Sequence, residues 1–195
     1  SGGEDRAQSA LPLPCALLAW ALAGPTPVVY HPNPGERAFG AARSSRPPAL
    51  QLEPGFNVVF AGNLGTAQAL ETIVSAALLL RDEPTVRFVL VGSGSRSDWL
   101  NEQVQRHGLT NLQLPGRFSP DEMPGILTQA SALLVSLTRD PIFAQTVPSK
   151  VQAYLAAGKP IVAALDGEGA RIVLAAGAGV ACPAEDAAAL AAAVR

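Results

Sequence analysis

From residue 56 onward, the apolar positions fall into short runs without polar alternation, which predict strands covered on both faces. The predicted strands are 56–61, 86–91, 111–114, 132–137, 160–164 and 180–182. Between and after them lie segments of helix length, at 67–80, 97–107, 120–129, 149–157, 169–176 and 184–195. Strict alternation of strands and helices predicts an α/β fold with a doubly wound, Rossmann-like parallel sheet.

The chain before residue 52 has a different texture. An apolar run at 11–24 contains two prolines and is too short to span about 30 Å of hydrocarbon, so it predicts a packed helix over 14–23. Acidic residues precede this run, which disfavours the alternative of a signal peptide. Residues 26–51 are rich in Pro, Gly, Ser and Arg and predict a strand at 28–31 followed by an extended connector.

Charge and cysteine content narrow the classes of partner. The chain has 195 residues and a net charge of −2, with 14 basic residues scattered among 16 acidic ones. This pattern argues against a nucleic-acid partner, and no integral membrane segment is predicted. Cys15 and Cys182 fit no metal-ligand spacing and are interpreted as two buried thiols in a reducing cytosol. No acidic pair follows a strand, so no metal site is predicted.

Glycine-rich loops follow the first three predicted strands of the repeating region. They are Gly62-Asn63-Leu64-Gly65, Gly92-Ser93-Gly94-Ser95 and Pro115-Gly116-Arg117. Ligands of such sheets bind outside the carboxyl ends of the strands, and glycine lets the backbone approach a ligand closely. The loops therefore predict a binding site at this edge, with simple chain reversal as the alternative for each loop alone. The strict dinucleotide fingerprint is absent, which disfavours an NAD-dependent oxidoreductase.

The segment 147–165, VPSKVQAYLAAGKPIVAAL, joins a helix to a buried strand and places Lys150 in the first helical turn. A helix N-terminus presents unpaired N–H groups and a partial positive charge. Together with Lys150 it would suit an anion such as a pyrophosphate. The alternative is a solvated surface lysine.

Residues 56–195 resemble the nucleotide-sugar-binding C-terminal domain of family-4-type retaining glycosyltransferases of the GT-B fold. The resemblance is carried, in order, by FNVVFAGNLGTAQALETIVSAA, FVLVGSGS, NLQLPGRFSPDEMPGILTQASALLVSL, VPSKVQAYLAAGKPIVAA and AGAGVACPAEDAAALAAAV. Upstream, VVYHPNPGERAF is similar to the strand and linker between the two domains of these enzymes. The resemblance therefore implies a donor-binding domain at 52–195, preceded at 1–51 by the end of an N-terminal domain and the interdomain linker.

This resemblance implies a hexosyltransferase-type enzyme that moves a sugar from a nucleotide diphosphate sugar, with retention, in bacterial surface-polysaccharide biosynthesis. The nucleotide sugar is a substrate, and no cofactor is implied. The acceptor would bind an N-terminal domain that is mostly missing here, so the chain is expected to be an inactive fragment that binds donor. A cytoplasmic location is expected, with peripheral attachment to the inner membrane through the missing domain left open.

The chain departs from the family pattern at four positions. Relatives carry an arginine and a lysine where this chain has Asn63 and Gln68, and a pair of glutamates near Gln145 and Ala153. Lys150 is then the natural replacement cation. The predicted donor-binding residues are Gly62, Asn63, Leu64, Gly65, Gly92, Gly94, Arg117, Lys150 and Glu168.

Other functions stay open at this point. The absence of charged residues at the four positions just named favours a non-catalytic nucleotide-binding module. A GT-B-like sugar-nucleotide epimerase is a further alternative, but it would need carboxylates and histidines in the cleft, which the segment does not supply. Asp140 is interpreted as a turn residue, and His31 and His107 as surface histidines. No catalytic residue is assigned.

Overall fold

The computed structural model describes residues 49–195. The predicted helix over 14–23, the strand over 28–31 and Cys15 lie outside the described residues. The strands are β1 (Phe56–Ala61), β2 (Val86–Val91), β3 (Leu112–Gly116), β4 (Ala132–Ser136), β5 (Ile161–Ala164) and β6 (Gly179–Cys182). The helices are η2 (Thr66–Gln68), α2 (Leu70–Leu79), α3 (Ser97–His107), α4 (Met123–Leu127), α5 (Pro141–Ala144), α6 (Ser149–Ala157), α7 (Glu168–Ala175) and α8 (Ala187–Val194).

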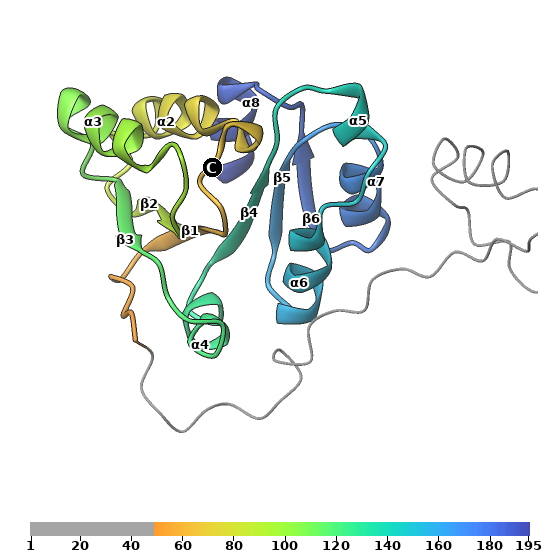
Figure 1. The fold of residues 1–195 in the computed structure, drawn as a ribbon, viewed down its shortest axis with the longest axis horizontal. Helices are drawn as coiled ribbons and strands as arrows, with labels where there is room; N and C mark the ends of the chain where they lie inside the picture. Colours follow the sequence, from red (N-terminus) through yellow and green to blue (C-terminus); the bar gives the residue numbers. More distant parts are fainter. Residues whose placement is uncertain (1–48) are drawn as a thin grey trace, which may run out of the picture. The chain divides into compact units, whose positions relative to one another are not determined.

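The six strands form one sheet in the order β3-β2-β1-β4-β5-β6 (Figure 1). Every neighbouring pair is parallel. The chain builds outward from β1 to β3 and then crosses to β4 on the other side of β1, which makes the β1/β4 boundary the topological switch point. The predicted doubly wound parallel sheet is confirmed.

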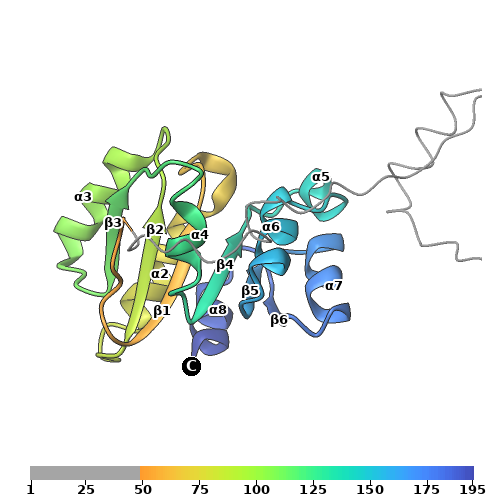
Figure 2. The same cartoon turned by 90° about the horizontal axis from the view of Figure 1, so that it is seen from below.

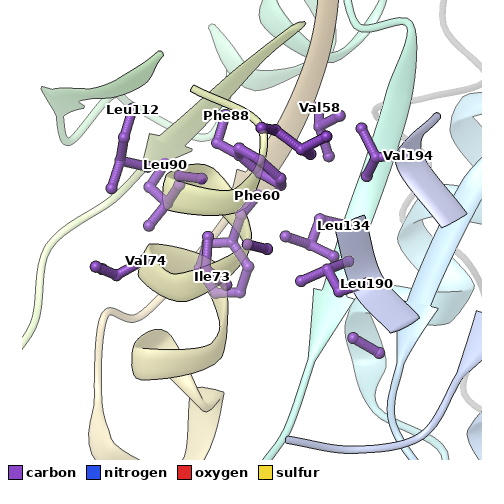
Figure 3. Close-up of a cluster of buried hydrophobic side chains, with 14 of the residues drawn as sticks. Val58, Phe60, Ile73, Val74, Phe88, Leu90, Leu112, Leu134, Leu190 and Val194 are labelled. Atoms are coloured by element: carbon purple, nitrogen blue, oxygen red, sulfur yellow. The ribbon is translucent and has the colours of Figure 1, made fainter. Parts of the chain in front are cut away.

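Helices cover both faces of this sheet because successive strand residues point to opposite faces. Val58 and Phe60 belong to a core shared with α2, α3 and α8, whereas Val59 belongs to a second core shared with α4, α6 and α7. Figure 3 shows Phe60 in the first core, among Ile73 and Leu190. Helices α2 and α8 lie side by side although they are far apart in the sequence (Figures 1 and 2). Each fully buried side chain of this kind stabilises the fold by about 1.5–3 kcal/mol.

The predicted helix over 67–80 is interrupted in the structure. Ala69 adopts φ 46° and ψ 47°, so the segment divides into η2 and α2. The backbone N–H of Thr138 donates to the carbonyl of Ala67 over 3.0 Å and fixes η2 against the segment that follows β4. Tertiary structure thus overrides a sequence of good helix formers.

Helix α5 was not predicted. It has four residues, and the Asp140 carboxylate caps it by accepting from the N–H of Ile142 over 2.7 Å. The interpretation of Asp140 as a turn residue agrees with this geometry. For the other helices and strands, the predicted first and last residues differ from the observed ones by no more than about one helical turn.

The sheet separates near its switch point. β1 pairs with β2 along its whole length, from Phe56 to Ala61, but with β4 only at Val58 and Val59. Beyond these pairs, the N–H of Ala61 donates to the hydroxyl of Tyr154 on α6 over 2.9 Å. The Tyr154 side chain is buried, which raises the pKa of its hydroxyl above the ordinary value. Tyr154 therefore completes the edge of β1 where β4 no longer does.

Replacing the Tyr154 hydroxyl should destabilise the fold. The variant Tyr154→Phe keeps the ring but leaves the N–H of Ala61 without its acceptor, so the free energy of unfolding should fall by about 1–3 kcal/mol. Urea denaturation of both proteins measures this difference. An unchanged midpoint would show that the hydroxyl contributes nothing to the edge of β1.

Candidate functional site

Backbone hydrogen bonds join the three glycine-rich loops into one layer at the carboxyl edge of the sheet. The first loop donates to the end of β2 and to the second loop, and the second loop donates to the third. The bonds run from Gly62 N to Val91 O (2.9 Å), Leu64 N to Ser93 O (3.0 Å) and Gly92 N to Gly116 O (2.8 Å). The loops therefore form a single surface and not three separate turns.

Two glycines are required by this close approach. Gly92 has φ +145°, and a Cβ there would lie 1.8 Å from the carbonyl oxygen of Gly62. A Cβ at Gly94 would lie 2.4 Å from the carbonyl oxygen of Leu64. Any side chain at either position would force the first and second loops apart.

A cavity of about 630 Å³ opens over these loops. This volume is in the range of small-molecule sites. Its walls come from the ends of β1, β2 and β3, from α4 and from the first turns of α6. The lining residues are Ala61, Gly62, Asn63, Val91, Gly92, Ser93, Gly94, Arg117, Phe118, Pro120, Met123, Leu127, Ser149, Lys150, Ala153 and Tyr154.

Helix α6 begins at this cavity. Its N-cap, Pro148, makes no side-chain capping bond, and the first turn contains no acidic residue. Ser149 and Lys150 line the cavity. Because the first N–H groups of a helix have no partner within the helix and carry the positive end of its dipole, this end of α6 favours an anion.

Lys150 reaches from α6 across the end of β1. Its Nζ donates to Oε1 of Gln68 over 2.7 Å and lies 4.9 Å from the centroid of the Phe60 ring. A Cβ on Gly62 would lie 2.8 Å from Cε of Lys150, so the lysine passes directly over Gly62 and a side chain there would displace its end. Burial lowers the pKa of Lys150. Within residues 49–195, no carboxylate oxygen lies within the 4.0 Å of an ion pair with its ammonium.

The structure brings most of the predicted site residues together. The cavity is lined by Gly62, Asn63, Gly92, Gly94, Arg117 and Lys150, whereas Leu64 and Gly65 are buried in the loop and do not line it. Arg117 is exposed at the rim.

Glu168 does not line the cavity. It opens α7 as predicted, but its carboxylate pairs with Arg171. The hydrogen bond from Arg171 is the main cause that lowers the pKa of Glu168. In this structure its partner is therefore a neighbouring side chain on its own helix.

Sequence reasoning missed the apolar wall of the cavity and Tyr154. The wall includes Phe118, Met123 and Leu127, which lie in a segment that carries the family resemblance but to which the sequence assigned no role in the site. Tyr154 follows Lys150 by four residues, and this spacing places two side chains on one face of a helix. Applied to α6, the spacing would have found it.

Between residues 49 and 195, no three His, Cys, Asp or Glu side chains form a group able to hold a metal ion. None of the helices in this range combines the length and the apolar character needed to cross a bilayer. Cys182 is buried with a free thiol.

Residues 55–195 match the family model described as glycosyl transferases group 1. The chain belongs to this family. The resemblance stated from the motifs is thereby confirmed.

Two curated proteins and one solved structure illustrate the relationship. WcaI of Escherichia coli strain K12, named as a colanic acid biosynthesis glycosyl transferase, is 37% identical over 101 residues, or 52% of this chain and 24% of its own. WbjE of Pseudomonas aeruginosa, named as a glycosyltransferase, is 34% identical over 134 residues, or 68% of this chain and 33% of its own. The chain thus spans about a quarter to a third of these group 1 relatives.

The crystal structure of HepE from Anabaena in complex with UDP-glucose covers 72% of this chain and 38% of its own, with a TM-score of 0.59. The two sequences are 22% identical over this range. At this identity the likeness concerns the fold, and it agrees with the glycosyltransferase family match.

A side chain at Gly92 should be far more damaging than one at Gly108. Both glycines have positive φ, but a Cβ at Gly108 meets nothing within 4 Å. Gly108→Ala should therefore cost only the backbone penalty of about 1–2 kcal/mol, whereas Gly92→Ala adds the collision with Gly62. Thermal unfolding of the two variants measures the difference. Equal unfolding temperatures would contradict the close packing of the loops.

Proposed function

We propose that residues 52–195 form the donor-binding domain of a glycosyltransferase that transfers a sugar from a nucleoside diphosphate sugar during bacterial surface-polysaccharide assembly. The observation that carries the proposal is the arrangement of three glycine loops, the start of α6 and Lys150 around one cavity. These groups suit a pyrophosphate, because backbone N–H groups, a helix dipole and an ammonium all favour negative charge.

Charge at the cavity supports an anionic ligand. Lys150 and Arg117 are the charged residues in its lining, and no lining residue within the described range is acidic. The Lys150 ammonium is partly buried and has no carboxylate partner among the described residues, which is unfavourable for the empty fold. A bound diphosphate would supply the missing negative charge.

One relative and one structural neighbour support the choice of pathway and of donor. WcaI is named for colanic acid biosynthesis, and the HepE structure contains UDP-glucose. A uridine diphosphate sugar is therefore the first ligand to test. Assays of the full-length enzyme are needed to identify the sugar and the acceptor.

In transfer, the domain would act mainly on the leaving group. As the bond between the sugar and the diphosphate breaks, negative charge develops on the departing phosphate. Lys150 and the first turn of α6 would stabilise that charge, as preorganised dipoles and cations do. The retaining outcome is part of this proposal and rests on the family resemblance.

Catalysis and acceptor binding would need groups beyond those that line this cavity. Its described lining contains neither a carboxylate nor a histidine. We therefore propose that an N-terminal domain supplies the acceptor site, and that residues 52–195 alone bind donor without transfer. The same observation favours a non-catalytic nucleotide-binding module as the second candidate, and transfer by the full-length enzyme would decide between them.

Removing the Lys150 charge should weaken donor binding. Lys150→Met keeps most of the apolar stem but removes the charged donor, so the Kd for UDP-glucose should rise by about 10–100-fold, as expected when about 1.5–3 kcal/mol is lost. Lys159→Met is the matched control, because Lys159 is the other lysine of the chain and does not line the cavity. Isothermal titration measures all three proteins. Equal affinity for wild type and Lys150→Met would exclude the role given to Lys150.

The ligand-free domain should become more stable when Lys150 is replaced. Because burial lowers the pKa of Lys150, the unfolded chain holds more protons than the folded one between that lowered pKa and 10.5. The free energy of unfolding should therefore rise with pH in this window. Below the window Lys150 is charged in both states, so the full cost of burying its charge lowers the stability of the fold. Lys150→Met should raise the unfolding temperature at pH 7 and flatten its dependence on alkaline pH. Scanning calorimetry across pH checks both effects, and a lower unfolding temperature at pH 7 would contradict the cost of burial.

A further inference from the structure

Gln68 holds the Lys150 ammonium without neutralising it. Nζ of Lys150 donates to Oε1 of Gln68 over 2.7 Å. A lysine has only donors, so the oxygen of the amide must be the atom that faces it. An amide oxygen fixes the position of the ammonium and leaves its full positive charge available, whereas a carboxylate at the same place would form an ion pair.

The backbone around Gln68 is fixed on both sides. Its N–H donates to the carbonyl of Gly65 over 3.2 Å, and the neighbouring carbonyl of Ala67 accepts from Thr138 over 3.0 Å. Ala69, which follows Gln68, is buried and adopts the left-handed conformation that alanine disfavours. An unfavourable backbone conformation held in place by its surroundings is typical of functional sites. Here it ends η2 directly after Gln68.

The route of the Lys150 side chain brings its ammonium to Gln68. The Lys150 stem crosses Gly62 at a point where a Cβ would lie 2.8 Å from Cε, and its ammonium faces the Phe60 ring. Gln68 is the side chain that accepts a hydrogen bond from this ammonium in the described structure. Without Gln68, no polar group among the described residues would hold Nζ at the end of β1.

We propose that Gln68 is a positioning residue for the anion site, which holds Lys150 at the cavity as an unneutralised cation. This inference rests on the proposed function, because it concerns how the same cavity binds a diphosphate. The relevant charged groups are few: Arg117 is the other charged residue that lines the cavity, and no carboxylate in the described range pairs with Lys150. A single added carboxylate at position 68 would therefore neutralise Lys150.

The variant Gln68→Glu tests this directly, since it changes the charge and almost nothing of the shape. We expect the Kd of the full chain for UDP to rise at least tenfold. Gln105→Glu adds the same charge on the exposed side of α3, away from the cavity, and should leave the Kd unchanged. If Gln68→Glu binds UDP as tightly as the wild type does, the proposal is wrong.

A second measurement reports on Lys150 itself. The chain contains two lysines, Lys150 and Lys159, so a protein labelled with ¹³C-lysine gives two ε-carbon signals. In the wild type, burial lowers the pKa of Lys150, so its signal should titrate below the ordinary range of a lysine side chain. In Gln68→Glu it should titrate at a higher pH than in the wild type, whereas the signal of Lys159 should not move. If the two side chains did not lie in contact in solution, no such selective shift would follow, so this measurement tests the contact between Lys150 and position 68.

The two measurements separate this inference from the proposed function. If the wild type binds UDP and Gln68→Glu neither weakens binding nor shifts the Lys150 signal, the positioning role fails and the nucleotide site stands. If the wild type binds neither UDP nor another nucleoside diphosphate, the proposed function fails. In that case the selective shift of the Lys150 signal still supports the contact, and an unmoved signal overturns it. A cooperative unfolding transition in Gln68→Glu, as in the wild type, shows that both measurements compare folded proteins.

Discussion

The structure depends on the separation of β1 from β4 at the topological switch point. β4 pairs with β1 at two positions only, so the carboxyl end of β1 needs other partners on that side. Helix α6 supplies them. Tyr154 accepts a hydrogen bond from the β1 backbone, and Lys150, one turn earlier, reaches Gln68 across the same strand end. The same two side chains of α6 line the cavity, together with the glycine loops that follow β1 and β2.

This arrangement trades stability for affinity toward an anion. In the described structure the partly buried ammonium of Lys150 faces an amide and an aromatic ring and has no carboxylate partner, so the hydration that it loses is only partly replaced. The loop glycines carry a related cost, because glycine loses more backbone entropy on folding than other residues. Both features are unfavourable for the empty fold. Both are useful if a diphosphate must approach the backbone closely and meet positive charge there.

Hydrophobic patterning predicted the sheet because its strands are apolar on both faces and separated by clear turns. Strands 56–61 and 86–91 agree with β1 and β2 to the residue. The sequence also pointed to the edge of the sheet at which the cavity opens, since Gly62, Gly92 and Lys150 all line this cavity. It could not reveal the left-handed Ala69 or the contact between Gln68 and Lys150. These depend on packing between segments far apart in the chain, which local propensity does not encode.

The central claim is that the diphosphate of a nucleotide binds between the glycine loops and the start of α6. Amide ¹H–¹⁵N spectra of the domain, recorded with and without UDP, test this most directly. The account predicts the largest shifts at Gly62, Gly94, Ser149 and Lys150, which line the cavity. Shifts confined to the groove of α2 and α8 around Glu71 and Glu185, or no shifts at all, would contradict it.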